Sequence, residues 1–174
     1  FEMTNPVADV CENTAVVADK DSTLMYIFTK EKPVGAVETA QPVLKARVAR
    51  TGVVAAVLQD GEKTWINFYA KDGSLIAENQ TRIDSPGYPL DIAVSPDGKL
   101  IMVSYLYAEN SQTNSYVAYY NFSSAGEGEI DNIVAAYTYE GIVVPQVEYL
   151  GDGTSLAFRE NGFSVYEGND APKE

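Results

Sequence analysis

Short apolar runs, each bounded by a turn that contains glycine or proline, follow one another along almost the whole chain. The sharpest turn is Ser95–Lys99, with the sequence SPDGK. In it Pro96 presets φ, and Gly98 takes the positive φ that other residues avoid. Apolar residues alternate or cluster on both sides, over 90–94 and 100–103. The pattern predicts a β-hairpin, because the turn reverses the chain between two short strands.

The same plan recurs further along the chain. In the second segment, Asp-Gly turns at 60–61 and 72–73 separate apolar runs, and Asp-Gly in this setting is the strongest short-range hairpin signal. The last segment ends after three predicted strands. The segments have the approximate bounds 7–40, 44–83, 89–140 and 145–168.

The spacing of the segments indicates the fold class. Matching positions near Ala46, Ile92 and Val147 are 46 and 55 residues apart, and a weaker start near Val7 precedes them by 39. Repeats of about 40 to 50 residues with four strands each are typical of propeller blades. We therefore expect an all-β fold of propeller-like, antiparallel four-stranded blades, three to four in number, within a single domain over 1–174.

Blades have apolar faces that neighbouring blades must cover. Two arrangements satisfy this requirement. In the first, residues 1–6 supply the outer strand that is missing from the last segment and close a small four-bladed ring. In the second, the chain is an arc of a larger propeller, and the remainder of that propeller is absent or provided by a second copy. The irregular repeat spacing favours the arc, and its open flanks predict self-association.

The charge of the chain narrows the range of partners. It carries 25 acidic and 12 basic residues, a formal net charge of −13. Such a chain repels phosphate backbones and anionic lipid heads, so we expect no nucleic acid partner.

No window approaches the roughly 18 apolar residues of a membrane span, so we expect no membrane insertion by this segment. The start, FEMTNPVADV, lacks an initiating Met and the features of a signal peptide, which suggests a processed product or a piece of a longer protein.

Histidine is absent from the chain. Without it, Ser-His-Asp catalysis, Cys-His catalysis and His-ligated zinc are excluded. Cys11 is the single cysteine, and we expect it to be a small buried apolar residue rather than a nucleophile. The acids of 19–23 (DKDST) are spaced like part of a calcium loop, but they lack its glycine and distal glutamate, so a turn is expected. We therefore expect no catalytic residue, no cofactor and no metal site.

Tyrosines gather on two adjacent predicted strands, with a polar loop expected over Glu109–Ser115 between them. Because successive side chains point to opposite faces, neighbouring tyrosines on one strand cannot share a face. They either pack between blades or, together with Trp65, form an aromatic binding surface for a carbohydrate or a peptide. These tyrosines are Tyr105, Tyr107, Tyr116, Tyr119 and Tyr120.

Residues 91–105, DIAVSPDGKLIMVSY, resemble the inner hairpin of WD-type and TolB-like propeller repeats, which consist of an apolar strand, Ser-Pro-Asp-Gly-Lys/Arg and a second apolar strand. The likeness is looser over 46–78 and 146–168, and the Gly-His and Trp-Asp dipeptides of WD repeats are missing. The whole chain also resembles uncharacterised extracytoplasmic propeller-like proteins of Gram-positive bacteria, which have an N-terminal membrane anchor. This resemblance implies a soluble ectodomain of a membrane-anchored or secreted bacterial protein.

Three classes of function follow from these observations. The favoured one is a non-enzymatic interaction, scaffold or sensor domain at the cell surface, which binds a protein partner or a second copy through open blade flanks. A carbohydrate-binding module, with cell-wall carbohydrate bound on the strand tyrosines, is the first alternative. The second alternative is a hydrolase or lyase that uses carboxylates alone, such as Asp91 with Glu148.

Overall fold

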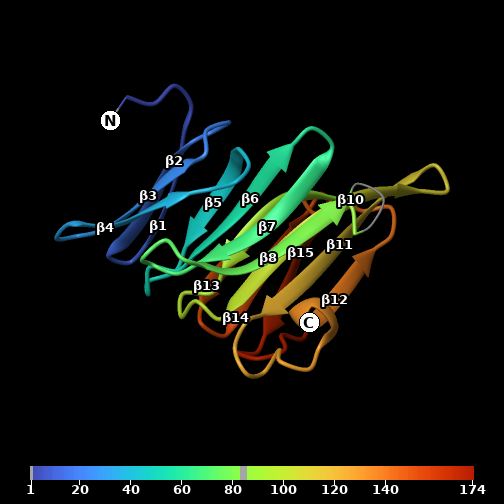
Figure 1. Ribbon diagram of the computed structural model, residues 1–174. Coiled ribbons are helices and arrows are strands. Elements are labelled where there is room, and N and C mark those ends of the chain that lie inside the picture. Colours follow the sequence, from blue (N-terminus) through green and yellow to red (C-terminus); the bar gives the residue numbers. More distant parts are fainter. Residues whose placement is uncertain (1, 83–85) are drawn as a thin grey trace. The chain divides into compact units, whose positions relative to one another are not determined.

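The computed structural model describes residues 2–82 and 86–174. By its internal contacts the chain divides into two compact units, one formed by residues up to Gln80 together with Pro96–Gly98, the other by Thr81–Ser95 and Lys99–Glu174. Each unit is built around two antiparallel sheets whose strands are neighbours in chain order (Figure 1). No helix in the described ranges is long and apolar enough to cross a membrane.

The first unit contains two meanders of four strands each. The first sheet consists of β1 (Pro6–Cys11), β2 (Thr14–Asp19), β3 (Leu24–Thr29) and β4 (Pro33–Glu38). The second sheet consists of β5 (Val43–Val48), β6 (Val54–Asp60), β7 (Lys63–Tyr69) and β8 (Leu75–Arg82). Strand β5 packs beside β1 and β2, so the first strand of one meander lies against the start of the other.

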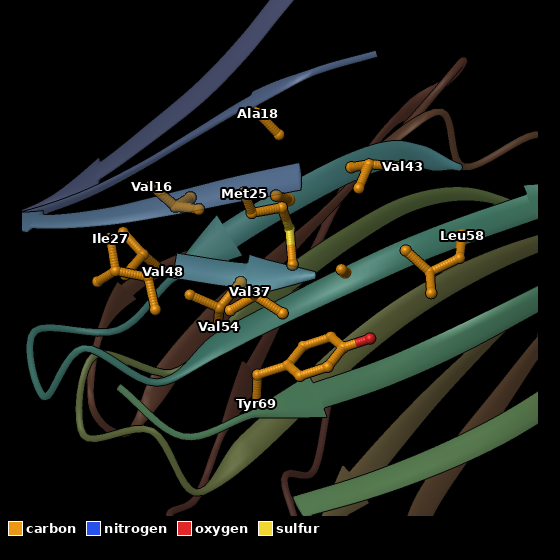
Figure 2. Close-up of a cluster of buried hydrophobic side chains, with 12 residues drawn as sticks. Val16, Ala18, Met25, Ile27, Val37, Val43, Val48, Val54, Leu58 and Tyr69 are labelled. Atoms are coloured by element: carbon orange, nitrogen blue, oxygen red, sulfur yellow. The ribbon is translucent and has the colours of Figure 1, made fainter. Parts of the chain in front are cut away.

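Alternation along the strands builds the core of the first unit. On β2 and β3, buried side chains such as Val16 and Ile27 alternate with half-buried ones. Figure 2 shows how the buried side chains of the two sheets meet. The cluster consists of Val16, Ala18, Met25, Ile27, Val37, Val43, Ala46, Val48, Val54, Ala56, Leu58 and Tyr69. Burial of this apolar face is the main force that holds the two sheets together.

The turn that the sequence marked most sharply has the predicted chemistry. Gly98 adopts a φ of 78°, in the region that favours glycine. The Ser95 hydroxyl accepts hydrogen bonds from the backbone N–H groups of Lys99 and Leu100, at 3.2 and 3.0 Å. The carbonyl of Pro96 accepts the Arg50 amide at 3.0 Å, which ties the turn into the first unit.

The second unit contains one four-stranded and one three-stranded sheet. The first of these consists of β9 (Tyr88–Val94), β10 (Leu100–Glu109), β11 (Gln112–Asn121) and β12 (Ile133–Tyr139), with the short 3-10 helix η1 (Ile130–Asn132) before β12. The other consists of β13 (Gln146–Gly151), β14 (Thr154–Arg159) and β15 (Gly162–Glu167). The predicted all-β class with antiparallel meanders is confirmed, whereas a single domain over 1–174 stays a prediction.

The polar loop expected over Glu109–Ser115 is wrong. Strand β10 continues to Glu109 and β11 begins at Gln112, so only Asn110 and Ser111 turn the chain. Both have positive φ, 51° and 63°, as in the two-residue turns whose twist matches that of the flanking strands. Asparagine tolerates this conformation, so the polar residues on either side can pair as strand.

Thr4 and Asn5, which one of the two expected arrangements assigned to the last segment, pair with the first sheet. The backbone amides of Thr4 and Asn5 donate to the Asp19 carboxylate, and the Asn5 carbonyl accepts the Lys20 amide, so these residues belong to the first sheet. Beside β15, the edge is instead bonded by the chain's own last residues. Glu167 and Lys173 exchange two backbone hydrogen bonds of 2.8 and 2.9 Å.

Candidate functional site

The predicted aromatic surface is largely inside the protein. The side chains of Tyr105 and Tyr119 are fully buried and that of Tyr120 nearly so, which means that a ligand cannot contact their rings. The Tyr105 and Tyr120 hydroxyls bond each other at 2.7 Å. Of the five tyrosines, Tyr107 and Tyr116 alone keep partly exposed side chains. For the three buried rings, the structure agrees with the packing interpretation.

Tyr119 belongs to a tyrosine cluster between the two sheets of the second unit. Its hydroxyl bonds the Ser155 hydroxyl at 2.8 Å, and its ring contacts Tyr166 edge-on at 5.5 Å between centroids. The hydroxyl of Tyr139 reaches both Tyr166 and Ser164. These rings fill the space between β11, β12 and the β14–β15 hairpin, so they join the two sheets rather than present a surface.

Trp65 has a similar structural role in the first unit. It is half-buried on β7 and packs against the cluster that joins the two sheets. On the same strand Asn67 is buried and donates to the Tyr69 hydroxyl at 2.9 Å and to the Glu78 carboxylate at 3.1 Å. The indole therefore contributes to the packing of the first unit's core, to which Tyr69 also belongs.

Asp91, the first residue of the proposed carboxylate pair, has a structural contact. Asp91 is 2% exposed, and its Oδ2 accepts the backbone amide of Val147 at 2.9 Å. Asp9 does the same in the first unit, where its Oδ2 accepts the Val48 amide at 2.8 Å. In both units the acid lies on the first strand of one sheet and bonds the first strand of the next. We conclude that Asp91 joins sheets.

Cys11 and Asp19 also make contacts that stabilise the fold. Burial and the neighbouring Glu12 carboxylate raise the pKa of the Cys11 thiol, which disfavours the reactive thiolate. Cys11 packs against the first unit's core, although it is half-buried rather than fully buried as the sequence predicted. The Asp19 carboxylate accepts backbone amides at the start of the chain. Among the described residues, no cluster of acidic or cysteine side chains could hold a metal ion.

The outward face of the last sheet is the first candidate for binding. Its side chains form two cross-strand pairs, Leu156 opposite Val165 and Phe158 opposite Phe163. Phe163 is 61% exposed, and Leu150 at the end of β13 is 67% exposed. Apolar residues adjoin each other here without cover, which is uncommon on a soluble surface and marks interaction sites. We call Leu150, Leu156, Phe158, Phe163 and Val165 the β13–β15 face.

The outward face of the first sheet has the same character. Val10, Ala15 and Phe28 are aligned across β1, β2 and β3, and the next aligned set runs through Val17 and Tyr26. Val10 is 69% exposed, and the others are half-buried. A shallow cavity of about 320 Å³ at the end of this face is lined by Val10, Ala15 and Phe28 among others. We call Val10, Ala15, Val17, Tyr26 and Phe28 the β1–β4 face.

Most of each face lies on two strands whose opposite sides are buried, β2 and β3 in the first unit and β14 and β15 in the second. Val16 and Met25 are fully buried behind the β1–β4 face, and Ala157 and Tyr166 behind the β13–β15 face. On β2 and β3 apolar residues occupy most positions, which is typical of a sheet that is covered on both sides. The β1–β4 face is therefore built like the blade surfaces that pack against each other within each unit, and the β13–β15 face presents paired apolar side chains in the same way.

Successive antiparallel meanders of four or three strands, packed through their faces, define a protein built of β-propeller blades. The chain belongs to the DUF5711 family, described as a family of unknown function, whose model matches residues 1–174. No curated protein matches the chain.

Solved structures share this fold at low sequence identity. Hsv2 from Kluyvelomyces marxianus is 14% identical with a TM-score of 0.61, and the match covers 92% of this chain and 55% of that one. The uncharacterized protein lmo1340 from Listeria monocytogenes EGD-e is 11% identical with a TM-score of 0.53, covering 99% and 53%. Sqt1 from Saccharomyces cerevisiae is 12% identical with a TM-score of 0.51, covering 92% and 43%. The chain thus spans about half the length of these proteins or less, and the likeness concerns the fold alone.

Proposed function

We propose that this chain is a non-enzymatic interaction domain that binds through the β1–β4 face and the β13–β15 face. The observation that carries the proposal is the contiguous, half-exposed apolar surface on strands whose opposite sides are fully buried. Burial of such surface stabilises an association by roughly 25 cal/mol per Å² of apolar area, before the costs of association are counted. The partner that fits is another blade, since blades already cover faces of this kind within each unit.

The occupant that we propose is a second copy of the chain. The β13–β15 face of one copy packs against the β1–β4 face of the other. At the same time, the β1–β4 face of the first copy packs against the β13–β15 face of the second. Each contact joins two different faces, and a two-fold axis closes the pair. Two copies double the number of blades, and the solved structures with this fold are about twice as long as the chain.

A position outside the cell membrane is part of the same proposal. Its support is the resemblance to extracytoplasmic propeller-like proteins of Gram-positive bacteria, together with the acidic composition. In that setting the domain acts as a scaffold or sensor, and its turns are free for further binding.

The test uses one variant on each face. Val10→Asp and Phe163→Asp introduce a charge at exposed positions, so both variants should fold, and each should weaken self-association at least tenfold in sedimentation equilibrium. A mixture of the two variants retains one intact contact and should associate more strongly than either variant alone. Ile130→Asp is the matched control, because Ile130 is 84% exposed and lies on neither face.

Two results would contradict the proposal. The first is association that Val10→Asp and Phe163→Asp leave at the level of Ile130→Asp. The second is a mixture that associates no better than the separate variants, since that would show that the two faces do not bind each other.

A further inference from the structure

A cavity of about 530 Å³ lies at one end of the two sheets of the first unit. Its walls come from the β3–β4 turn, the β5–β6 turn and the β7–β8 turn, which are far apart in the sequence. Small-molecule sites in proteins have volumes of about 300 to 1,000 Å³. The lining residues are Thr14, Thr29, Lys32, Pro33, Val34, Arg50, Thr51, Gly52, Lys71 and Asp72.

The cavity gathers positive charge on a strongly acidic chain. Lys32, Arg50 and Lys71 line it, three of only 12 basic residues, whereas Asp72 is the single acid among the lining residues. Glu12 lies nearby, with a carboxylate oxygen 3.8 Å from Arg50 Nη1. Cations inside a concave site with low-dielectric walls produce a stronger local potential than the same cations on a flat surface.

Asp72 is held by its own turn. Its Oδ1 accepts hydrogen bonds from the Ser74 amide at 3.0 Å and from the Ser74 hydroxyl at 2.6 Å. These bonds lower the pKa of the Asp72 carboxyl, so it stays ionised. The carboxylate therefore serves the turn that carries Lys71.

Close backbone contacts fix the turns that carry the cations. A Cβ on Gly52 would lie 2.8 Å from the Cβ of Lys71, so the lysine stem rests directly on the glycine. A Cβ on Gly73 would lie 2.6 Å from the carbonyl oxygen of Ala36 on β4. The Thr14 hydroxyl donates to the Arg50 carbonyl at 3.0 Å, and the Thr29 hydroxyl to the Lys32 carbonyl at 3.2 Å. The turns thus hold their positions before any ligand binds, which lowers the cost of binding.

We propose that this cavity binds a small phosphate ester. Its phosphoryl group lies among Lys32, Arg50 and Lys71, where a planar guanidinium and two ammonium groups supply charge-assisted hydrogen bonds. Its organic part lies over Pro33 and Val34, which provide apolar lining. The net charge of −13 repels a polyanion, so the geometry selects a small ligand rather than a nucleic acid chain.

The test compares phenyl phosphate with inorganic phosphate by NMR titration of the intact chain at low ionic strength. We expect saturable shifts at the amides of Thr51, Gly52 and Asp72, and phenyl phosphate should bind at least threefold more tightly. Lys32→Gln and Lys71→Gln should each weaken binding about tenfold, which corresponds to about 1.4 kcal/mol. Lys63→Gln is the matched control, since it removes the same charge from the exposed first residue of β7 in the same unit, and Lys63 does not line the cavity.

Three results would overturn the proposal. Shifts that do not saturate, or shifts that Lys63→Gln weakens as much as Lys71→Gln does, would show a non-specific effect of charge. Equal affinity for inorganic phosphate and phenyl phosphate would show that the organic part of the ester is not bound, because the apolar lining would then contribute nothing to the affinity.

Discussion

Asp9 and Asp91 show how single side chains join neighbouring sheets. Each accepts a backbone amide from the first strand of the following sheet, at 2.8 and 2.9 Å. The sequence alone suggested a catalytic carboxylate at Asp91, because a contact with Val147, 56 residues away, leaves no local signal. The turn glycine Gly98 was predictable, since its φ depends on the residues directly around it.

Replacement of Asp91 by alanine should destabilise the second unit by about 1 to 3 kcal/mol, because the buried Val147 amide loses its partner. Asp91→Asn keeps an accepting oxygen and should cost less. Urea denaturation followed by circular dichroism measures both. Glu127→Ala, an exposed loop variant with the same change of charge, should have little effect. Equal stability of Asp91→Ala and Glu127→Ala would show that the bond does not stabilise the fold.

Gly98→Val should destabilise the protein by about 1 to 3 kcal/mol, because valine is strained at positive φ. A Cβ at this position would also lie 2.7 Å from the Thr51 hydroxyl oxygen. Thermal denaturation measures the loss. Gly128→Val is the control, because nothing lies within 4 Å of its added Cβ. A melting temperature that Gly98→Val leaves unchanged would contradict the turn geometry.

At the scale of strands, alternation of apolar residues predicted most of the pairing. The β6 and β7 strands and the hairpin around Gly98 form where the turns indicated. The tight turn at Asn110–Ser111 was missed because its flanking residues are polar on both sides. The uncovered faces were expected only in general terms, because a continuous apolar run shows that both sides of a strand are apolar but not which side a neighbour covers.

The buried tyrosine pair of β10 and β11 should make the fold sensitive to alkali. Burial raises the pKa of Tyr120 to about 12 and raises that of Tyr105 well above its usual value. Their ordinary pKa in an unfolded chain is about 10, so the folded state holds more protons above that pH. The contribution of this pair to the free energy of unfolding should therefore be constant up to about pH 10 and fall between about pH 10 and pH 12.

Urea denaturation at a series of pH values measures this dependence. In Tyr105→Phe and Tyr120→Phe, each of which removes one titrating group, the slope between these pH values should be smaller than in the wild type. A stability that does not change across the range, or equal slopes in wild type and variants, would show that these phenols do not titrate differently on folding.

The last residues act as an edge element for the β13–β15 sheet. Lys173 bonds Glu167 through the backbone, the Pro172 carbonyl accepts the Tyr137 hydroxyl at 2.7 Å, and the Glu174 carboxylate accepts the Ser164 hydroxyl at 2.6 Å. Removal of residues 170–174 should speed amide hydrogen exchange in β15 at least tenfold and leave exchange in β2 and β3 unchanged. Unchanged protection of β15 would contradict a stabilising role.

At the scale of the whole molecule, the resemblance to propeller repeats predicted the fold class, and the solved structures confirm that the fold is shared. The sequence could not predict which sheet faces stay uncovered, nor that a basic cavity forms. Both features depend on residues from distant turns and strands that meet only in the folded chain. Lys32, Arg50 and Lys71 do share one feature in the sequence, since each lies in or beside a turn between predicted strands.

The solution mass of the chain, measured by light scattering over a wide range of concentrations, tests the central claim most directly. The chain has a mass of 18.9 kDa. Self-association through the two apolar faces predicts a mass that rises with concentration to twice this value and no further, because the two contacts close the pair. A mass that stays at 18.9 kDa at every concentration would contradict the account, since it would show that these faces need no second copy.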